Sequence, residues 1–143
     1  PPRSAAPLDL ADDLLEPADP KGEVLVAVAG DVRTHHLFGE DLDLDYHPAP
    51  FTAAVAPVVG GYRVTVRATS YVRDVGLLAD KVAADAVVDD MLVSLTAGEA
   101  HHFLVRTSQT LPDPAVLLDL RVLRCANTII GGDRPPDWPA TLG

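Results

Sequence analysis

The stretch Gly61-Tyr62-Arg63-Val64-Thr65-Val66-Arg67-Ala68-Thr69 decides the fold class of this chain. Its even positions from 62 to 68 are Tyr, Val, Val and Ala, whereas its odd positions from 63 to 69 are Arg, Thr, Arg and Thr. Successive side chains of an extended backbone point to opposite faces, so this strand has one apolar and one polar face. A second layer must cover the apolar face, and the pattern therefore predicts one half of a β-sandwich.

The same alternation continues on either side of the turn Thr96-Ala97-Gly98-Glu99. The apolar-phase positions are Met91, Val93 and Leu95 before the turn, and His101, Phe103 and Val105 after it. Two alternating segments around a short glycine turn are typical of a β-hairpin. We therefore expect these segments to pair with each other and to pack on a second sheet.

Further strand-like segments occur along most of the chain, separated by Gly, Pro and acidic residues. Val24–Ala29 is apolar throughout, which predicts a strand buried on both faces or in the middle of a sheet. The segment from Leu77 to Leu92 fits loop and short strand better than the helix that could also be drawn through it. The other expected strands are Arg33–Gly39, Phe51–Val59, Tyr71–Leu78 and a last strand in which Leu118, Leu120 and Val122 alternate with Asp119 and Arg121. The chain is thus predicted to be an all-β, immunoglobulin-like sandwich of about 7–9 antiparallel strands.

The length of 143 residues suits one ordinary domain. Prolines are frequent in residues 1–20, which we interpret as a linker from a preceding domain, with Leu10–Glu16 irregular. The predicted sandwich spans residues 21–128, and residues 129–143 form a Gly/Pro-rich tail. Because the chain starts with Pro1-Pro2, we interpret it as a fragment of a longer polypeptide.

The formal net charge of −10 disfavours nucleic acid and anionic membranes as partners. No apolar run reaches the roughly 18 to 20 residues that cross a bilayer, and no secretion signal is visible. The single cysteine, Cys125, cannot form an internal disulfide. These features favour the cytoplasm without fixing the compartment.

Acidic residues alternate with leucine in Glu40-Asp41-Leu42-Asp43-Leu44-Asp45, as at the start of a calcium loop. An EF-hand needs glycine at its sixth position and glutamate at its twelfth, where this chain has Tyr46 and Thr52. On an extended backbone the three aspartates would share one face and the two leucines the other. We therefore expect a solvated edge or loop and no metal site.

Other residue types that often carry chemistry lack the required arrangement. The pairs His35-His36 and His101-His102 could contribute metal ligands together with His47. Neighbouring residues of a strand point to opposite faces, however, so each pair can supply one ligand at most. No nucleophile signature surrounds Ser70, Ser94, Ser108 or Cys125, and Cys125 is expected to be a buried, inert thiol. Asp89-Asp90 are expected to form a turn. The sequence thus predicts no catalytic, cofactor-binding or metal-binding residue and no cofactor.

Binding of sugars by stacking needs exposed aromatic rings, and this chain has few. Tyr62 and Phe103 fall on the core phase, and Trp138 lies in the proline-rich tail. Carbohydrate binding by this domain is therefore not expected.

Several segments together resemble one known domain. Val88–Glu99, with its acidic pair, strand and Leu-x-x-Gly-Glu turn, is similar to a block in the C-terminal immunoglobulin-like domain of β-mannosidases of the glycoside hydrolase family 2 type. The segments Arg33–Leu44, Gly61–Val66, Val72–Asp74 and Leu123–Asn127 resemble further elements of that domain in the same order. The resemblance covers roughly residues 20 to 128; Met91 replaces a usual aromatic residue, and Ala97 a usual proline.

This resemblance implies a parent enzyme that removes terminal β-linked mannose with two glutamates of a separate barrel. None of Glu16, Glu23, Glu40 and Glu99 has the context of a barrel strand, so no catalytic residue is carried over and this fragment is not expected to be an enzyme. The resemblance implies an accessory domain that stabilises the catalytic barrel by packing on other domains of the same polypeptide, with contact between subunits as a further option. The alternative is a carbohydrate-binding module that directs the parent to mannan.

Overall fold

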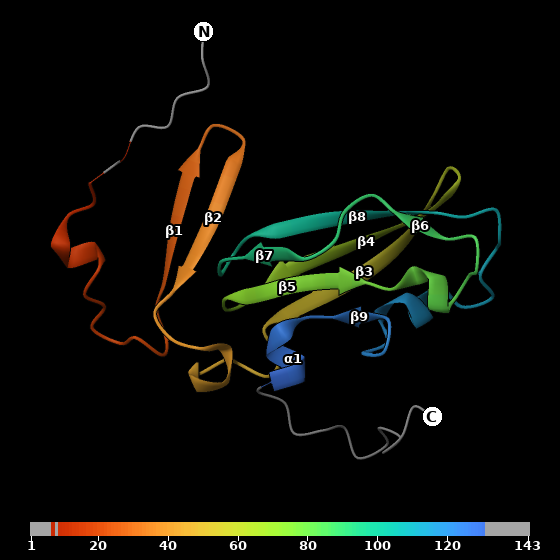
Figure 1. Ribbon diagram of the computed structural model, residues 1–143. Coiled ribbons are helices and arrows are strands. Elements are labelled where there is room, and N and C mark those ends of the chain that lie inside the picture. Colours follow the sequence, from red (N-terminus) through yellow and green to blue (C-terminus); the bar gives the residue numbers. More distant parts are fainter. Residues whose placement is uncertain (1–6, 8, 131–143) are drawn as a thin grey trace, which may run out of the picture. The chain divides into compact units, whose positions relative to one another are not determined.

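The computed structural model describes residue 7 and residues 9–130. By its internal contacts the chain separates into two compact units, Pro1–Asp45 and Tyr46–Gly143. The described strands are β1 (Val24–Ala29), β2 (Val32–Leu37), β3 (Phe51–Val58), β4 (Gly61–Ala68), β5 (Val72–Leu77), β6 (Val87–Val88), β7 (Val93–Leu95), β8 (Ala100–Arg106) and β9 (Leu123–Arg124) (Figure 1). The described helical elements are the 3-10 turns η1 (Asp12–Leu14), η2 (Asp41–Asp43), η3 (Ala79–Lys81) and η4 (Pro114–Leu118) and the short helix α1 (Ala126–Ile130).

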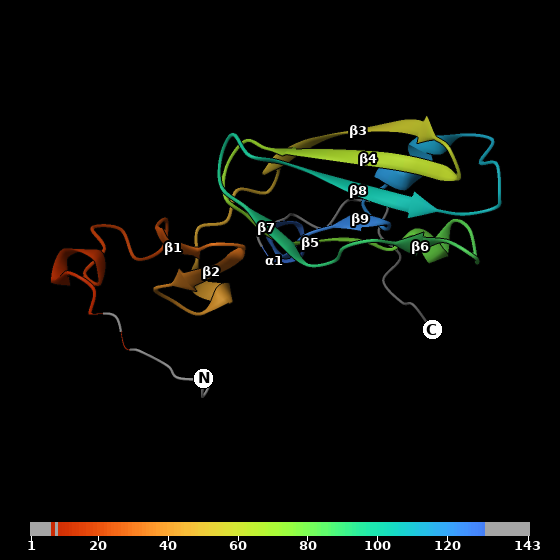
Figure 2. The same ribbon diagram turned by 90° about the horizontal axis from the view of Figure 1, so that it is seen from above.

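The second unit is an all-β sandwich, as predicted from the alternating pattern. One sheet has the order β3-β4-β8-β6, and the facing sheet has the order β7-β5-β9. All described strand pairs are antiparallel. Figure 2 shows β3, β4 and β8 as one layer, with β5, β7 and β9 in the other.

The apolar phase of β4 supplies the centre of the core. Tyr62, Val64, Val66 and Ala68 are all buried, and Phe103 and Val105 of β8 lie opposite Val64 and Tyr62 in the ladder. The facing sheet contributes the buried side chains Val72, Val75, Leu77, Leu95 and Leu123. The period-two pattern therefore places each apolar row between the two layers, where burial of apolar area is the main stabilising term.

The expected hairpin between residues 91–95 and 101–105 is wrong. β7 pairs with β5, and β8 pairs with β4 and β6, so the turn at Gly98 (φ 87) carries the chain from one sheet to the other. Ala68 at the end of β4 holds this turn through two backbone hydrogen bonds. The Gly98 N–H donates to the Ala68 carbonyl at 2.9 Å, and the Ala68 N–H donates to the Glu99 carbonyl at 2.9 Å. Two segments with the same apolar phase fit facing sheets as well as one sheet, and Met91, outside β7, is 43% exposed.

The expected last strand through Leu118, Leu120 and Val122 is also wrong. Asp113 caps a helical turn there by accepting a hydrogen bond from the Ala115 N–H at 2.9 Å, with Pro114 in the first turn. Both residues favour the start of a helix. The chain enters a strand only at Leu123, in β9, and then forms the helix α1, which the sequence did not predict.

The segment from Leu77 to Leu92 is loop and short strand, as expected. It contains the end of β5, the 3-10 turn η3 and the two-residue strand β6, which pairs with the end of β8. Ala79 and Ala83 of this segment pack in the core.

The first unit contains a two-stranded hairpin, β1–β2, closed by Gly30 and Asp31. The φ of +60° at Gly30, the first central position, fits a type II′ turn. Val24–Ala29 was expected to be buried on both faces, but Val28 is 67% exposed. β1 also pairs with β2 alone among the described strands, so the alternative expectation, a position in the middle of a sheet, is wrong too.

The acidic segment lies in a solvent-exposed loop, as expected, but its backbone does not have the extended form that would place the two leucines on one face. Asp41–Asp43 is a 3-10 turn, in which the Asp43 N–H donates to the Glu40 carbonyl at 2.9 Å. Leu42 is 84% exposed while Leu44 is buried, so the two leucines do not share a face. The tighter period of a 3-10 turn replaces the period of two that the alternation suggested.

Candidate functional site

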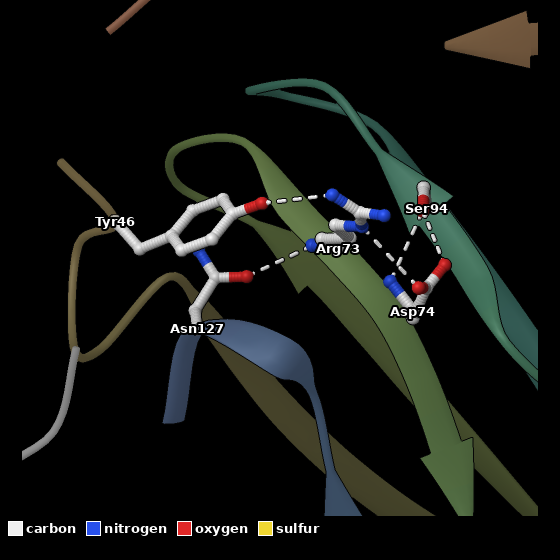
Figure 3. A network of polar contacts seen from close by, with 5 residues as sticks. All are labelled: Tyr46, Arg73, Asp74, Ser94 and Asn127. Atoms are coloured by element: carbon white, nitrogen blue, oxygen red, sulfur yellow. Dashed lines mark hydrogen bonds and ion pairs between the residues drawn. The ribbon is translucent and has the colours of Figure 1, made fainter. Parts of the chain in front are cut away.

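The most connected polar cluster of the described residues lies at a bulge in β5 (Figure 3). The pairing of β5 with β7 shifts register between Val72 and Val75, and Asp74 adopts a φ of +54°. Aspartate tolerates this left-handed conformation better than most residues. The Ser94 hydroxyl accepts a hydrogen bond from the Asp74 N–H at 3.0 Å and donates to Asp74 Oδ1 at 3.2 Å, so one side chain serves the extra residue of the bulge.

Arg73 lies between this bulge and the start of the second unit. Its Nε donates to Asp74 Oδ2 at 3.3 Å and its Nη1 donates to the Tyr46 hydroxyl at 3.3 Å (Figure 3). The Arg73 and Asp74 side chains are 28% and 43% exposed. An ion pair with this exposure is partly screened by water and contributes little to stability by itself.

Asn127 of α1 supplies the missing strand partner of β5. Its Oδ1 accepts a hydrogen bond from the Arg73 N–H at 2.8 Å, and its Nδ2 donates to the Tyr71 carbonyl at 2.8 Å. The residue is fully buried. A side-chain amide carries a donor and an acceptor side by side, as a neighbouring strand would, so Asn127 continues the hydrogen bonding of β5 where β9 does not reach.

The chemistry open to this cluster is limited. The Ser94 hydroxyl donates to the Asp74 carboxylate and accepts from the Asp74 N–H, and no histidine takes part, so the serine–histidine pair typical of an activated serine is not formed here. Both polar atoms of the Asn127 amide bond to the backbone, at Arg73 in β5 and at Tyr71 just before it. The cluster therefore stabilises the sheet β7-β5-β9, and the residues drawn in Figure 3 do not form a catalytic arrangement.

A second polar cluster surrounds Asp85. Its carboxylate accepts hydrogen bonds from Thr107 Oγ1 (2.6 Å), Ser108 N (2.8 Å), Ser108 Oγ (2.6 Å) and Gln109 Nε2 (3.0 Å). The Ser108 hydroxyl, followed by that of Thr107, holds the pKa of the Asp85 carboxyl well below its ordinary value. These bonds connect the loop before β6 to the chain that leaves β8.

The neighbours His101 and His102 point to opposite faces of β8, as predicted. His101 Nε2 lies 3.5 Å from Asp90 Oδ2, whereas the neighbouring His102 Nδ1 bonds to Thr65 Oγ1 at 2.9 Å on the other face of β8. His47 Nδ1 accepts a hydrogen bond from the Ala49 N–H at 3.1 Å. Within residues 9–130 no three His, Cys, Asp or Glu side chains come together as metal ligands would.

Cys125 is buried, as expected from its context. Burial raises the pKa of the thiol, while hydrogen bonds to Thr128 act in the opposite direction and are smaller. A thiol that stays protonated at neutral pH is a weak nucleophile.

The carboxylates considered in the sequence have local roles where the structure shows them. Asp89 Oδ1 accepts from the Leu104 N–H of β8 at 2.8 Å, and Asp90 Oδ1 accepts from the Met91 N–H at 2.8 Å. The chain bends at Asp89, but the expected hydrogen-bonded turn is not formed. Glu23 Oε1 accepts from the Asp19 N–H at 2.8 Å, and Glu99 Oε2 from the Thr96 N–H at 2.6 Å. Each of these bonds supports a turn or strand end.

The aromatic residues on the core phase are buried as predicted, with Phe103 0% and Tyr62 5% exposed. The Tyr62 hydroxyl accepts a hydrogen bond from the Leu111 N–H at 2.6 Å. Trp138 lies outside the described residues.

Two features of the site were missed from the sequence. Asn127 gave no local signal, because its partners lie 54 and 56 residues earlier in the chain. The alternation in β4 predicted a polar face that carries arginines, but we interpreted this face only as solvent-exposed.

Comparison of the chain with protein-family models, with curated proteins and with solved structures finds no match. In the part of the chain that the structure describes, none of the helices combines the length and the apolar character that a membrane crossing requires.

Proposed function

We propose that this chain is a non-catalytic β-sandwich that stabilises a larger enzyme by packing against its other domains. The observation that carries this proposal is that the polar clusters of the sandwich bond to its own backbone and side chains. The bonds of Asp74, Ser94, Asn127 and Asp85 all hold strands, turns or loops of the sandwich in place. A domain whose reactive side chains are used in this way acts through its surface.

The proposed parent is a β-mannosidase-like glycoside hydrolase. Its support is the collinear resemblance of five segments within residues 20 to 128 and the β-sandwich fold that this resemblance implies. Retaining glycosidases need two carboxyl groups about 5–5.5 Å apart across the scissile bond. The resemblance implies that the two glutamates of a separate barrel supply them, so we assign the reaction to that barrel of the parent.

Deletion of residues 46–130 from the parent polypeptide tests the stabilising role. We expect a lower melting temperature and faster loss of activity on heating, since the deletion exposes apolar surface on the neighbouring domain. The parent carrying Arg121→Gln, a change at an exposed side chain of this domain, is the matched control. Unchanged melting and turnover of the deleted form would contradict the proposal.

The isolated chain provides a second test against the rival functions. We expect no hydrolysis of a chromogenic β-mannoside and no retardation in a gel that contains mannan. Retardation would favour the carbohydrate-binding alternative, although the burial of Tyr62 and Phe103 leaves neither ring available for stacking on a sugar.

A further inference from the structure

The outer face of the β3-β4-β8-β6 sheet carries an array of basic side chains, which we call the arginine face. It consists of Arg63, Thr65 and Arg67 of β4 with His102 and Arg106 of β8. These residues alternate with the buried row of each strand, so they point away from the core. All three arginines are exposed.

The strand register sets the spacing of this array. Leu104 lies opposite Arg63, which makes Arg106 a diagonal neighbour of Arg63, and His102 lies opposite Thr65, which makes it a diagonal neighbour of Arg67. Diagonal neighbours in a sheet are about 7–8 Å apart. Arg63 and Arg67 are four residues apart on one strand, or about 13 Å.

The three arginines have no ionic partner among the residues that the structure describes. The strand residues of this sheet include no aspartate or glutamate. The carboxylates next to β6 and β8 in the chain accept other hydrogen bonds, because Asp85 bonds to residues 107–109, Asp89 to the Leu104 backbone and Glu99 to the Thr96 N–H. The guanidinium groups are thus free to bind an external anion.

The neighbouring strand leaves room for such a ligand. Opposite Arg67, Thr65 and Arg63, β3 presents the small residues Thr52, Ala54 and Ala56. These short side chains form a low strip beside the row of arginines. An extended chain lying on this strip could bring its carboxylates to the guanidinium groups without steric conflict.

We propose that the arginine face binds a carboxylate-rich, extended segment of a partner protein. Carboxylates at positions i and i+4 of an extended chain are also about 13 Å apart, which matches Arg63 and Arg67. Guanidinium groups bind carboxylates through paired, charge-assisted hydrogen bonds.

Two observations favour a protein segment over other polyanions. The whole chain carries a net charge of −10, which repels densely charged nucleic acids and sulfated glycans at long range. A short carboxylate-rich segment carries fewer charges than these polymers and is therefore less repelled, and the arginines act within a Debye length of about 8–10 Å. The face also lacks an aromatic ring on which a sugar could stack.

The test measures binding of the full chain to a fluorescent peptide of alternating Glu and Thr, with an alternating Gln and Thr peptide as the ligand control. We expect binding of the Glu peptide alone, weakened by added salt. The double substitution Arg63→Gln and Arg67→Gln should weaken binding about tenfold, since each exposed pair contributes up to about 1 kcal/mol. Arg121→Gln is the matched control, because Arg121 is an exposed arginine already paired with Asp119 and lies outside the arginine face.

Several results would overturn the proposal. Equal loss of binding in Arg121→Gln would show a general charge effect, and absence of binding by the native chain would remove the site. Tighter, Arg63-dependent binding of a heparin fragment would assign the face to glycans, and self-association lost in the double variant would assign it to a second copy. Melting curves of both variants show that the fold is retained. This outcome is separate from the deletion test, because the isolated chain can bind the peptide whether or not it stabilises a parent enzyme.

Discussion

The two sheets of the sandwich satisfy their backbone hydrogen bonds in different ways. β4 pairs with β3 over eight residues and with β8 over seven, in unbroken register. β5 pairs with β7 at two positions around a bulge and with β9 at two more. Side chains supply hydrogen bonds that these short pairings leave out. Ser94 bonds to the Asp74 N–H at the bulge, and Asn127 bonds to the backbone of residues 71 and 73.

This difference separates two sources of stability in one core. The sheet β3-β4-β8-β6, which we call the long sheet, depends on apolar side chains repeated every second residue. Its contribution to stability is therefore spread over many similar contacts. The short sheet, β7-β5-β9, also contributes buried apolar side chains, but part of its backbone hydrogen bonding depends on the single side chains Ser94 and Asn127. We therefore expect apolar truncation to be most damaging in the long sheet and loss of one amide to be most damaging in the short sheet.

The largest effect should follow from Phe103→Ala in β8. Phe103 is 0% exposed and belongs to the central core cluster. Removing its ring should lower the free energy of unfolding by about 3–5 kcal/mol, through lost burial and a residual cavity. Chemical denaturation measures this change.

His102→Ala, on the opposite face of the same strand, is the control for Phe103→Ala. It should cost less than about 1 kcal/mol, because it removes an exposed side chain. Comparable losses in the two variants would show that β8 does not have one buried and one exposed face.

Asn127→Ala should produce the next largest effect. The substitution removes the partner that the amide supplies to the Arg73 N–H and the Tyr71 carbonyl, at a fully buried site. Leaving buried polar groups without a partner should cost about 2–4 kcal/mol in total. Hydrogen exchange at the Arg73 amide should also become faster than in the native chain.

Ile129→Ala is the matched control for Asn127→Ala, since Ile129 is in the same short helix and 59% exposed. It should change the unfolding free energy by less than about 1 kcal/mol. If Ile129→Ala and Asn127→Ala were equally destabilising, the cost would belong to the helix and the amide would have no special role.

The sequence predicted the long sheet better than the short one for the same physical reason. Alternation identifies a half-buried strand such as β4 directly, and β3, β5 and β8 were located close to their observed ranges. Alternation does not specify which strand pairs with which, so Leu95 and Phe103 were assigned to one hairpin although their strands belong to different sheets. Capping by Asp113 and the side-chain amide of Asn127 act through single residues, which produce no periodic signal.

A smaller effect is expected for Ser94→Ala at the bulge. The serine hydroxyl accepts from the Asp74 N–H and donates to its carboxylate, in a half-buried environment. Losing it should cost about 1–2 kcal/mol, because water can replace part of the bonding. Ser94→Thr keeps the hydroxyl and should restore most of the stability; equal destabilisation by alanine and threonine would indicate that packing, and not the hydrogen bonds, sets the cost.

The smallest effect should come from Asp85→Asn, and it should depend on pH. Hydrogen bonds from Ser108 and Thr107 hold the pKa of the folded Asp85 carboxyl below its ordinary value of 3.8. A lowered folded-state pKa stabilises the protein fully above the unfolded value, and this stabilisation is lost as the pH falls toward the folded-state pKa. The native chain should therefore melt slightly above Asp85→Asn at pH 7, and the difference should shrink below about pH 4. Melting curves at several pH values measure it, with Asp80→Asn, a change at another exposed aspartate of the same segment, as the control. A difference between native and Asp85→Asn melting that stayed constant down to low pH would show that the ionised carboxylate is not what holds the loop before β6 to the end of β8.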